Sequence, residues 1–249
     1  MSIAKQQQLE PESFSLELNT VWSFPERGSW ATHNGSYRGN WSPYIPRNLL
    51  LRYTKEGDVI LDQFAGGGTT LVEAKLLNRN AIGYDINPLA IKRCEDKLAF
   101  EYPSTSEITI AEGDACHLDQ VNNESIDFIC THPPYADIIK YSKDISRDIS
   151  LLKKDEFLDQ MRLVANESFR VLKPKKYCAI LIGDMRKSGS VIPLGFEVMN
   201  IFLNSGFYNK EIIIKEQHNC TSTSKWAESS IKYNFFLLAH EYLFIFRKN

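Results

Sequence analysis

Short apolar runs alternate with stretches of helical spacing from residue 58 onward, and this alternation narrows the possible folds more than any other feature. The runs that predict buried strands are 58–62, 81–85, 107–111, 125–130, 176–182, 207–214 and 235–246. The stretches that predict helices are 47–53, 69–77, 89–100, 154–172 and 194–203. Strands that alternate with helices favour an α/β fold, here a mostly parallel seven-stranded sheet with helices on both faces and an antiparallel edge strand.

Composition and charge exclude several classes of protein. The formal net charge is −2, so no global basic field attracts nucleic acid, and any such binding requires a local basic face. The five cysteines are odd in number and include no C-x-x-C pair, which argues against a disulfide framework and against a metal site. The sequence shows no signal-peptide core and no apolar run of membrane-spanning length, so we expect a cytoplasmic protein.

A glycine-rich stretch, Asp-Gln-Phe-Ala-Gly-Gly-Gly at 62–68, directly follows the first predicted strand. Glycines there let the backbone approach a ligand closely at the carboxyl edge of the sheet. The spacing differs from the dinucleotide motif and lacks the lysine of a phosphate-binding loop, which disfavours NAD and ATP. Asp85 ends the second strand at a spacing typical of a ribose-binding acid, and Asp114 follows the third, where it could accept a hydrogen bond from an adenine amino group. These positions indicate a nucleoside cofactor.

A second motif, Thr-His-Pro-Pro-Tyr at 131–135, follows the fourth strand without a gap. An aryl amine is a poor nucleophile, and acceptors for its two hydrogens favour the geometry of the transition state. The rigid proline turn can aim the carbonyl of Pro133 at one hydrogen, while the side chain of His132 can accept the other. Tyr135 can stack on a base that has left the duplex.

In this combination the chain resembles the S-adenosylmethionine-dependent amino-methyltransferases that act on N6 of adenine or N4 of cytosine. Their Asp/Asn/Ser-Pro-Pro-Tyr/Phe/Trp motif is matched at 133–135, their Phe-x-Gly-x-Gly loop at 64–68, and their N-terminal cofactor element at 39–46. The resemblance covers about residues 20–185 and implies a Rossmann-like class I methyltransferase fold, S-adenosylmethionine as cofactor and DNA as partner. The cofactor-binding residues expected are Trp41, Pro43, Asp62, Phe64, Ala65, Gly66, Gly68, Thr69, Asp85, Ile86, Asp114, Ala115 and Thr131. The catalytic residues expected are His132, Pro133, Pro134 and Tyr135.

One residue departs from the family pattern, because His132 stands where the family usually has Asp, Asn or Ser. A neutral imidazole can accept one hydrogen bond, whereas the protonated ring cannot; His132 therefore either takes over that role or leaves it to a backbone carbonyl. The preceding Thr131 is similar to the Thr-Ser-Pro-Pro-Tyr form of cytosine-N4 enzymes, which favours cytosine over adenine.

The leading interpretation is a DNA methyltransferase of a restriction-modification or phage-defence system, acting with a restriction-system partner or as a homodimer. Two alternatives stay open: a methyltransferase of RNA bases or of protein glutamine, and an inactive module that only binds cofactor and nucleic acid. We expect an N-terminal arm and ligand-lining segment at 1–45 and a single catalytic domain at 46–249. A polar stretch at 215–232, predicted to be a loop, would be a small recognition element.

Overall fold

The computed structural model describes residues 8–37, 39–136, 139–219 and 221–249, without the side chains of 221–224. Its strands are β1 (Val21–Trp22), β2 (Val59–Asp62), β3 (Asn80–Asp85), β4 (Ile108–Glu112), β5 (Ile126–Thr131), β6 (Leu172–Ile182), β7 (Met185–Lys187), β8 (Ser190–Ile192), β9 (Tyr208–Glu216) and β10 (His240–Arg247). Its helices are α1 (Tyr44–Tyr53), α2 (Thr69–Leu76), α3 (Pro88–Leu98), α4 (Lys154–Val171), α5 (Leu194–Asn204) and α6 (Thr221–Lys232), with a short 3-10 turn at Ile149–Leu151. None of these described helices is long and apolar enough to cross a membrane.

The main sheet has the strand order β1-β9-β10-β6-β5-β2-β3-β4, and the predicted Rossmann-like α/β class is confirmed. Two details of the prediction were wrong. The sheet of the described residues has eight strands, because β1 adds parallel to β9 at one edge, with Val21 opposite Ile214. The antiparallel strand is β10, and it lies inside the sheet between β9 and β6 rather than at an edge.

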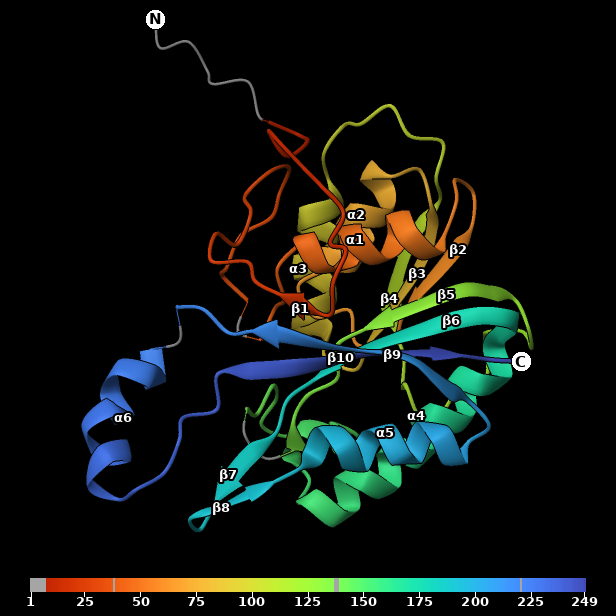
Figure 1. Cartoon of the computed structure of the whole chain (residues 1–249). Coiled ribbons are helices and arrows are strands. Elements are labelled where there is room, and N and C mark those ends of the chain that lie inside the picture. Colours follow the sequence, from red (N-terminus) through yellow and green to blue (C-terminus); the bar gives the residue numbers. More distant parts are fainter. Residues whose placement is uncertain (1–7, 38, 137–138, 220) are drawn as a thin grey trace, which may run out of the picture.

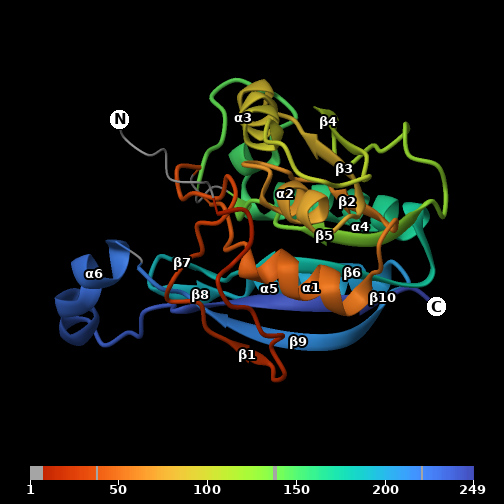
Figure 2. The ribbon, with the colours of Figure 1, turned by 90° about the horizontal axis from the view of Figure 1, so that it is seen from above.

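Side chains of the central strands alternate between two cores, one on each face of the sheet. On β6, Cys178 and Ile180 belong to the core under α4 and α5, whereas Ala179 and Leu181 belong to the core under α1 and α2. Figures 1 and 2 show these two helical layers, with α1, α2 and α3 on one face and α4 and α5 on the other. Both faces of the central strands are therefore dry, which explains their unbroken apolar runs.

The N-terminal segment is fixed to the body by a buried carboxylate. Glu73 on α2 is fully buried, and its Oε1 accepts hydrogen bonds of 2.7 Å from the indole of Trp30 and 2.7 Å from Nε2 of His33. Its Oε2 accepts from Arg47 of α1 at 2.9 Å. The aromatic stretch before α1 therefore forms part of the core on this face, and Trp30 packs edge-on against Tyr44.

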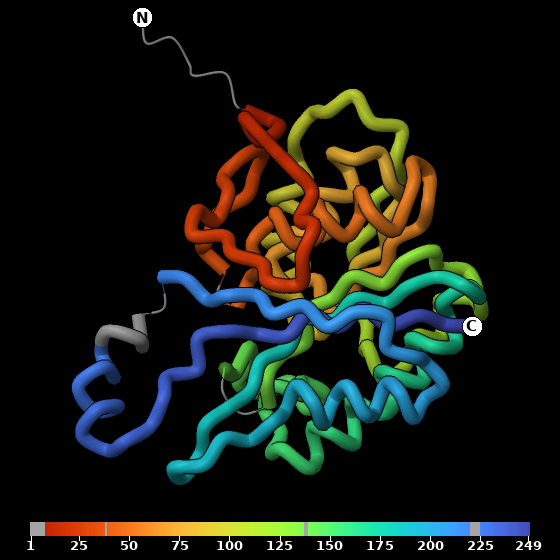
Figure 3. The backbone as a smooth tube through the Cα atoms, viewed as in Figure 1, coloured from red at the N-terminus to blue at the C-terminus, as the bar shows by residue number. Residues whose placement is uncertain are grey.

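Two insertions stand away from the sheet at the same edge, and we call them together the arm. They are the β7–β8 hairpin, 185–192, and the residues 217–219 and 221–239, which include α6 (Figure 3). Arg186 joins the two: its guanidinium donates to the carbonyl of Phe236 at 3.0 Å and covers the ring of Phe235 at 5.1 Å. The loop predicted at 215–232 was wrong, since β9 runs to Glu216 and α6 follows.

Candidate cofactor and catalytic site

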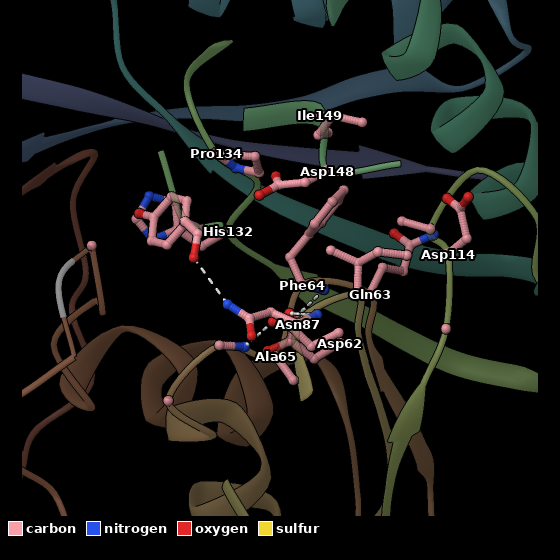
Figure 4. Close-up of a pocket in the computed structure, with 18 of the residues that line it drawn as sticks. Asp62, Gln63, Phe64, Ala65, Asn87, Asp114, His132, Pro134, Asp148 and Ile149 are labelled. Atoms are coloured by element: carbon pink, nitrogen blue, oxygen red, sulfur yellow. Dashed lines mark hydrogen bonds between the residues drawn. The ribbon is translucent and has the colours of Figure 1, made fainter. Parts of the chain in front are cut away.

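A cavity opens at the carboxyl ends of the parallel strands, where ligands bind in open α/β sheets, and together with the solvent at its mouth it spans about 780 Å³. Its walls come from the turns after β2, β3, β4 and β5, from residues 37 and 39–41, and from the loop at 141–149. Figure 4 shows His132 and Pro134 toward one end of the cavity, Asp114 at the other, and Phe64 and Ala65 between them. The two sequence motifs therefore face a single space.

The glycine-rich turn is held in shape by the acid at the end of β3. Gly66 has φ of 50°, a left-handed conformation that favours glycine, and its amide donates to Oδ2 of Asp85 at 2.8 Å. The other oxygen, Oδ1, accepts from the amide of Asn87 at 2.9 Å. Burial raises the pKa of Asp85 above its ordinary value, while these amides lower it. Each carboxylate oxygen has a second lone pair, so Asp85 can still accept from a ribose diol.

Asp114 follows β4 and lies at the end of the cavity away from His132 (Figure 4). Its Oδ1 accepts from the amide of Cys116 at 2.9 Å, and its Oδ2 lies 3.8 Å from a guanidinium nitrogen of the exposed Arg147. That oxygen is therefore in position to accept from an amino group on a purine ring. Ile86 and Ile149 supply apolar surface on the same cavity for a flat ring.

Asp62 lines the cavity but is almost fully buried. Its Oδ1 accepts from the hydroxyl of Thr131 at 2.8 Å and from the amide of Phe64 at 3.2 Å. Burial raises the pKa of Asp62 to about 6, although these hydrogen bonds act in the opposite direction. The Asp62–Thr131 bond joins the ends of β2 and β5, and so it holds the glycine-rich turn against the Pro-Pro turn.

His132 is stacked on Trp41 with ring centroids 5.6 Å apart, and a hydrogen-bond chain fixes its ring. Its Nε2 lies 2.8 Å from the hydroxyl of Tyr135, which donates to Oε1 of Glu241 at 2.7 Å. Oε2 of Glu241 is paired with Lys215 at 2.8 Å. Since the single hydroxyl hydrogen goes to the carboxylate, Nε2 must carry a hydrogen and donate it to Tyr135. The neutral ring then has its lone pair on Nδ1.

The protonation states along this chain agree with that assignment. Burial lowers the pKa of His132 to about 4, with a further lowering by Lys215 that Glu241 opposes. Burial alone would raise the pKa of Glu241, but Lys215 and the other partners hold it below its ordinary value. At neutral pH the pair is therefore a neutral imidazole and an ionised carboxylate. Within the described part of the chain, Nδ1 of His132 makes no hydrogen bond.

Most of the residues expected at the site line the cavity. They are Trp41, Asp62, Phe64, Ala65, Gly66, Asp85, Ile86, Asp114, Ala115, His132 and Pro134. The others lie behind its walls: Pro43 at the start of α1, Gly68 and Thr69 at the start of α2, Thr131 on Asp62, Pro133, and Tyr135 on Glu241. Gly68 is required there, because its φ is 75° and an added Cβ would lie 2.5 Å from the sulfur of Cys94.

Sequence reasoning missed the residues that cover the cavity from distant loops. Tyr37 packs over Gly66 and stacks on Tyr141 with centroids 5.9 Å apart, while Asn87 donates to the carbonyl of Tyr141 at 2.9 Å. Gly39, Asn40, Gln63 and Gly67 also line the cavity and lie within the two cofactor segments predicted at 39–46 and 62–68, whereas Gly113, Cys116, Arg147, Asp148 and Ile149 were not predicted as lining residues. The segment 1–45 was predicted to line a ligand in general, but no residue of 141–149 was predicted to belong to the cavity.

These residues suit S-adenosylmethionine, the cofactor that the resemblance implies. A glycine turn with left-handed Gly66, a strand-end carboxylate at Asp85 and a further carboxylate at Asp114 lie along one cavity. Asp85 would hold the ribose, Asp114 the adenine amino group and the turn at 64–68 the methionine portion.

Comparison with known proteins places the chain in a family. The DNA methylase family model matches residues 2–96 and 126–249. The Type II methyltransferase M.BsoBI of Geobacillus stearothermophilus is 36% identical over 96 residues, which are 37% of this chain and 18% of that protein. A tRNA (guanine(10)-N2)-dimethyltransferase of Methanothermobacter thermautotrophicus is 33% identical over 101 residues, 40% of this chain and 29% of that protein. The chain thus spans less than a third of these relatives' lengths.

Among solved structures, TrmN from Thermus thermophilus superposes with a TM-score of 0.59 at 19% identity, over 85% of this chain and 50% of that one. A SAM-dependent methyltransferase from Methanosarcina mazei has a TM-score of 0.55 at 16% identity, over 80% of this chain and 96% of that one. These likenesses confirm the methyltransferase fold, and fold and family together imply S-adenosylmethionine as the cofactor. Since the family model matches most of its length, the chain belongs to the DNA methylase family of N6 and N4 amino-methyltransferases.

Proposed function

We propose that the protein transfers a methyl group from S-adenosylmethionine to an exocyclic amino group of a DNA base, with N4 of cytosine preferred over N6 of adenine. One observation carries the proposal: His132 and Pro134 of the Pro-Pro turn and the strand-end acids Asp85 and Asp114 line the same cavity. The bound cofactor supplies an electrophilic methyl group. Residues of the protein must then hold the target amine and accept hydrogen bonds from its two N–H groups.

His132 is the side-chain acceptor in this proposal. Its Nε2 hydrogen is directed at Tyr135, so Nδ1 is the ring atom that can accept a hydrogen bond from the amine. The carbonyl of Pro133 takes the second amine hydrogen. Both contacts strengthen as positive charge develops on the amine nitrogen during transfer. His132 thereby replaces the Asp, Asn or Ser usual in the family.

The preference for cytosine rests on the Thr-His-Pro-Pro-Tyr sequence, which is similar to the Thr-Ser-Pro-Pro-Tyr form of cytosine-N4 enzymes. Tyr135 bonds to Glu241 and packs beside Gly183. Stacking of its ring on an extruded base stays a proposal. Such stacking requires the extruded base to enter the cavity beside the Pro-Pro turn, on the side of Tyr135.

The arm is the proposed contact with the duplex. β5 and β6 end, and β10 begins, at the same edge of the sheet, so both insertions emerge beside His132. The arm carries exposed aromatic side chains at Trp226, 51% exposed, and Phe236, 91% exposed. Lys225 and Lys232 are exposed beside them. Aromatic and basic side chains suit unstacked bases and phosphates respectively.

An RNA substrate is the second candidate, because one relative is a tRNA methyltransferase. The arm's exposed aromatic side chains would serve single-stranded RNA as well as an extruded DNA base. A restriction-system partner and a homodimer are further proposals for how the target sequence is selected.

One experiment separates these functions. The protein is incubated with isotopically labelled S-adenosylmethionine and separate pools of duplex DNA, single-stranded DNA and total RNA, and the digested nucleosides are identified by mass spectrometry. We expect labelled N4-methylcytosine from DNA. N6-methyladenine would correct the base, label only in RNA would correct the substrate, and no label with intact cofactor binding would favour the inactive module.

A further inference from the structure

Lys97 on α3 carries a buried amino group that has no partner within the described residues. The side chain is 8% exposed, and its Nζ makes no hydrogen bond. This nitrogen lies 3.3 Å from the point that a Cβ on Gly67 would occupy, so it sits directly beside the glycine-rich turn. An unpaired buried charge costs several kcal/mol, which makes this an unusual place for lysine without an anion.

Asn40 supplies a second donor beside the same turn. Its Nδ2 is also buried without a partner and lies 3.2 Å from the same Cβ point on Gly67. The amide orientation is set by Thr69, whose hydroxyl donates to Oδ1 of Asn40 at 2.5 Å. Thr69 opens α2, and the N-terminus of a helix carries a positive partial charge.

The electrostatic surroundings of Lys97 also favour an anion. Burial lowers the pKa of Lys97, and the guanidinium groups of Arg27 and Arg93 lower it further. The neighbouring Cys94 is a neutral thiol at physiological pH, since burial raises its pKa to about 12. Two unpartnered donors and a helix N-terminus thus meet next to Gly67, and two further cations act on Lys97.

We propose that Lys97 and Asn40 bind the α-carboxylate of the methionine portion of S-adenosylmethionine. Asn40 and Gly67 line the cavity that holds Asp85 and Asp114, so the carboxylate belongs to the same ligand. The carboxylate accepts from Nζ of Lys97 and Nδ2 of Asn40, and the adenosine portion lies toward Asp114. The inference rests on cofactor binding alone and does not depend on which nucleic acid is methylated.

The test measures how much the carboxylate contributes with and without the lysine. Affinities of S-adenosylmethionine and of decarboxylated S-adenosylmethionine are measured by calorimetry, without nucleic acid, for the wild type and Lys97→Met. A charge-assisted hydrogen bond is worth about 1.5–3 kcal/mol, so Lys97→Met should bind S-adenosylmethionine at least about tenfold more weakly. Its affinity for the decarboxylated compound should stay within about twofold. Lys92→Met is the control, because Lys92 lies exposed on the same helix, paired with Asp96.

Thermal unfolding without ligand guards against a structural role. Lys97→Met removes an unpaired buried charge, so it should melt at the same temperature as the wild type or higher. Equal loss of affinity for both compounds would make Lys97 a structural residue, and unchanged affinity for both would place the carboxylate elsewhere; either result overturns the proposal. If Lys97→Met does not fold, Asn40→Ala tests the same site and should again weaken only the carboxylated compound.

Discussion

His132 is joined through Tyr135 to Glu241 and Lys215, so its imidazole is held as one neutral tautomer. A carboxylate or amide at this position accepts with an oxygen in any protonation state near neutrality, whereas an imidazole must be both neutral and correctly protonated. The buried row of hydrogen bonds from His132 to Lys215 meets both requirements, because it keeps the ring neutral and places its hydrogen on Nε2. The sequence suggested His132 as one of two possible acceptors and gave no sign of the hydrogen bonds that fix its ring, because Glu241 is 109 residues from His132 along the chain.

The pH profile tests the acceptor. Because burial lowers the pKa of His132 to about 4, the neutral form persists well below its ordinary range, and activity should stay level down to about pH 5 before it falls. The mildly acidic limb that an unperturbed histidine would give is therefore not expected. His132→Asn should keep part of the activity and lose the limb near pH 4, and His132→Ala should be slower than either. The pH–rate profiles are measured at saturating cofactor and substrate.

Asp62 gives the competing explanation, since burial raises its pKa to about 6. A limb near pH 6 shared by the wild type and His132→Asn would belong to Asp62 rather than to His132. If the two proteins share their entire acidic profile, His132 is not the acceptor.

The hydroxyl of Tyr135 can be separated from its ring. Tyr135→Phe keeps an aromatic surface but no longer fixes His132, so turnover should fall about tenfold while cofactor affinity is unchanged. Tyr135→Ala should also weaken substrate binding if the ring stacks on the base, by about 1–3 kcal/mol. Tyr242→Phe is a matched control, because Tyr242 lies between His240 at 3.1 Å and Asp184 at 3.3 Å, away from the cavity lining. Equal effects of the two phenylalanine variants would argue for a general packing role.

Asp85 is the residue expected to hold the ribose. Asp85→Ala removes the acceptor of two ribose hydroxyls and also frees the amides of Gly66 and Asn87, so cofactor affinity should fall at least about 30-fold. Calorimetry with S-adenosylhomocysteine measures it. Asp114→Ala should cost less, because Asp114 meets a single amino group. A cofactor that binds Asp85→Ala as tightly as the wild type would rule out this assignment.

At the scale of elements, the arm should contact nucleic acid without touching the cofactor. Trp226→Ala and Phe236→Ala should each lower DNA affinity about tenfold, in line with the loss of one aromatic–base contact. Cofactor affinity should not change, and both are read by fluorescence anisotropy and calorimetry. Leu163→Ala on α4 is the control, an exposed apolar side chain outside the arm. DNA binding that survives both arm variants would place the interface elsewhere.

The sequence predicted the helices and strands that bury one or both faces, because burial makes their apolar residues recur at a regular spacing. The central strands and α4 have dry faces, so their apolar residues recur at the spacing of a strand or a helix. In α6, by contrast, the apolar side chains of Trp226 and Ile231 are 51% and 85% exposed, so packing against a core does not account for this helix. β1 contains only two residues and exists through its pairing with β9. Cavity residues at strand ends were predictable because the apolar runs locate the strands and therefore their ends. Tyr37 and Tyr141, by contrast, come into contact only in the tertiary fold.

At the scale of the whole molecule, Glu73 joins the N-terminal segment to α1 and α2. Glu73→Ala would leave Arg47 buried beside only Glu10, and would remove the acceptor of Trp30 and His33. Breaking a buried pair costs about 3–5 kcal/mol, so the midpoint of urea unfolding should fall markedly. Cofactor affinity should fall as well, because the loosened segment carries Tyr37 and Trp41 to the cavity. Full retention of cofactor affinity in the folded variant would show that this segment is not needed for binding.

The pairing of β1 with β9 also bears on synthesis of the protein. Val21 lies opposite Ile214 and Trp22 opposite Lys215, so the strand that precedes the cavity wall has its partner near the other end of the sequence. The β1 end of the N-terminal segment can therefore be fixed only after the ribosome has synthesised β9, whereas Glu73 joins its later part to α1 and α2. We expect the nascent polypeptide to remain unable to retain cofactor until β9 has emerged. Methyl transfer by unfinished chains would then be prevented by topology alone.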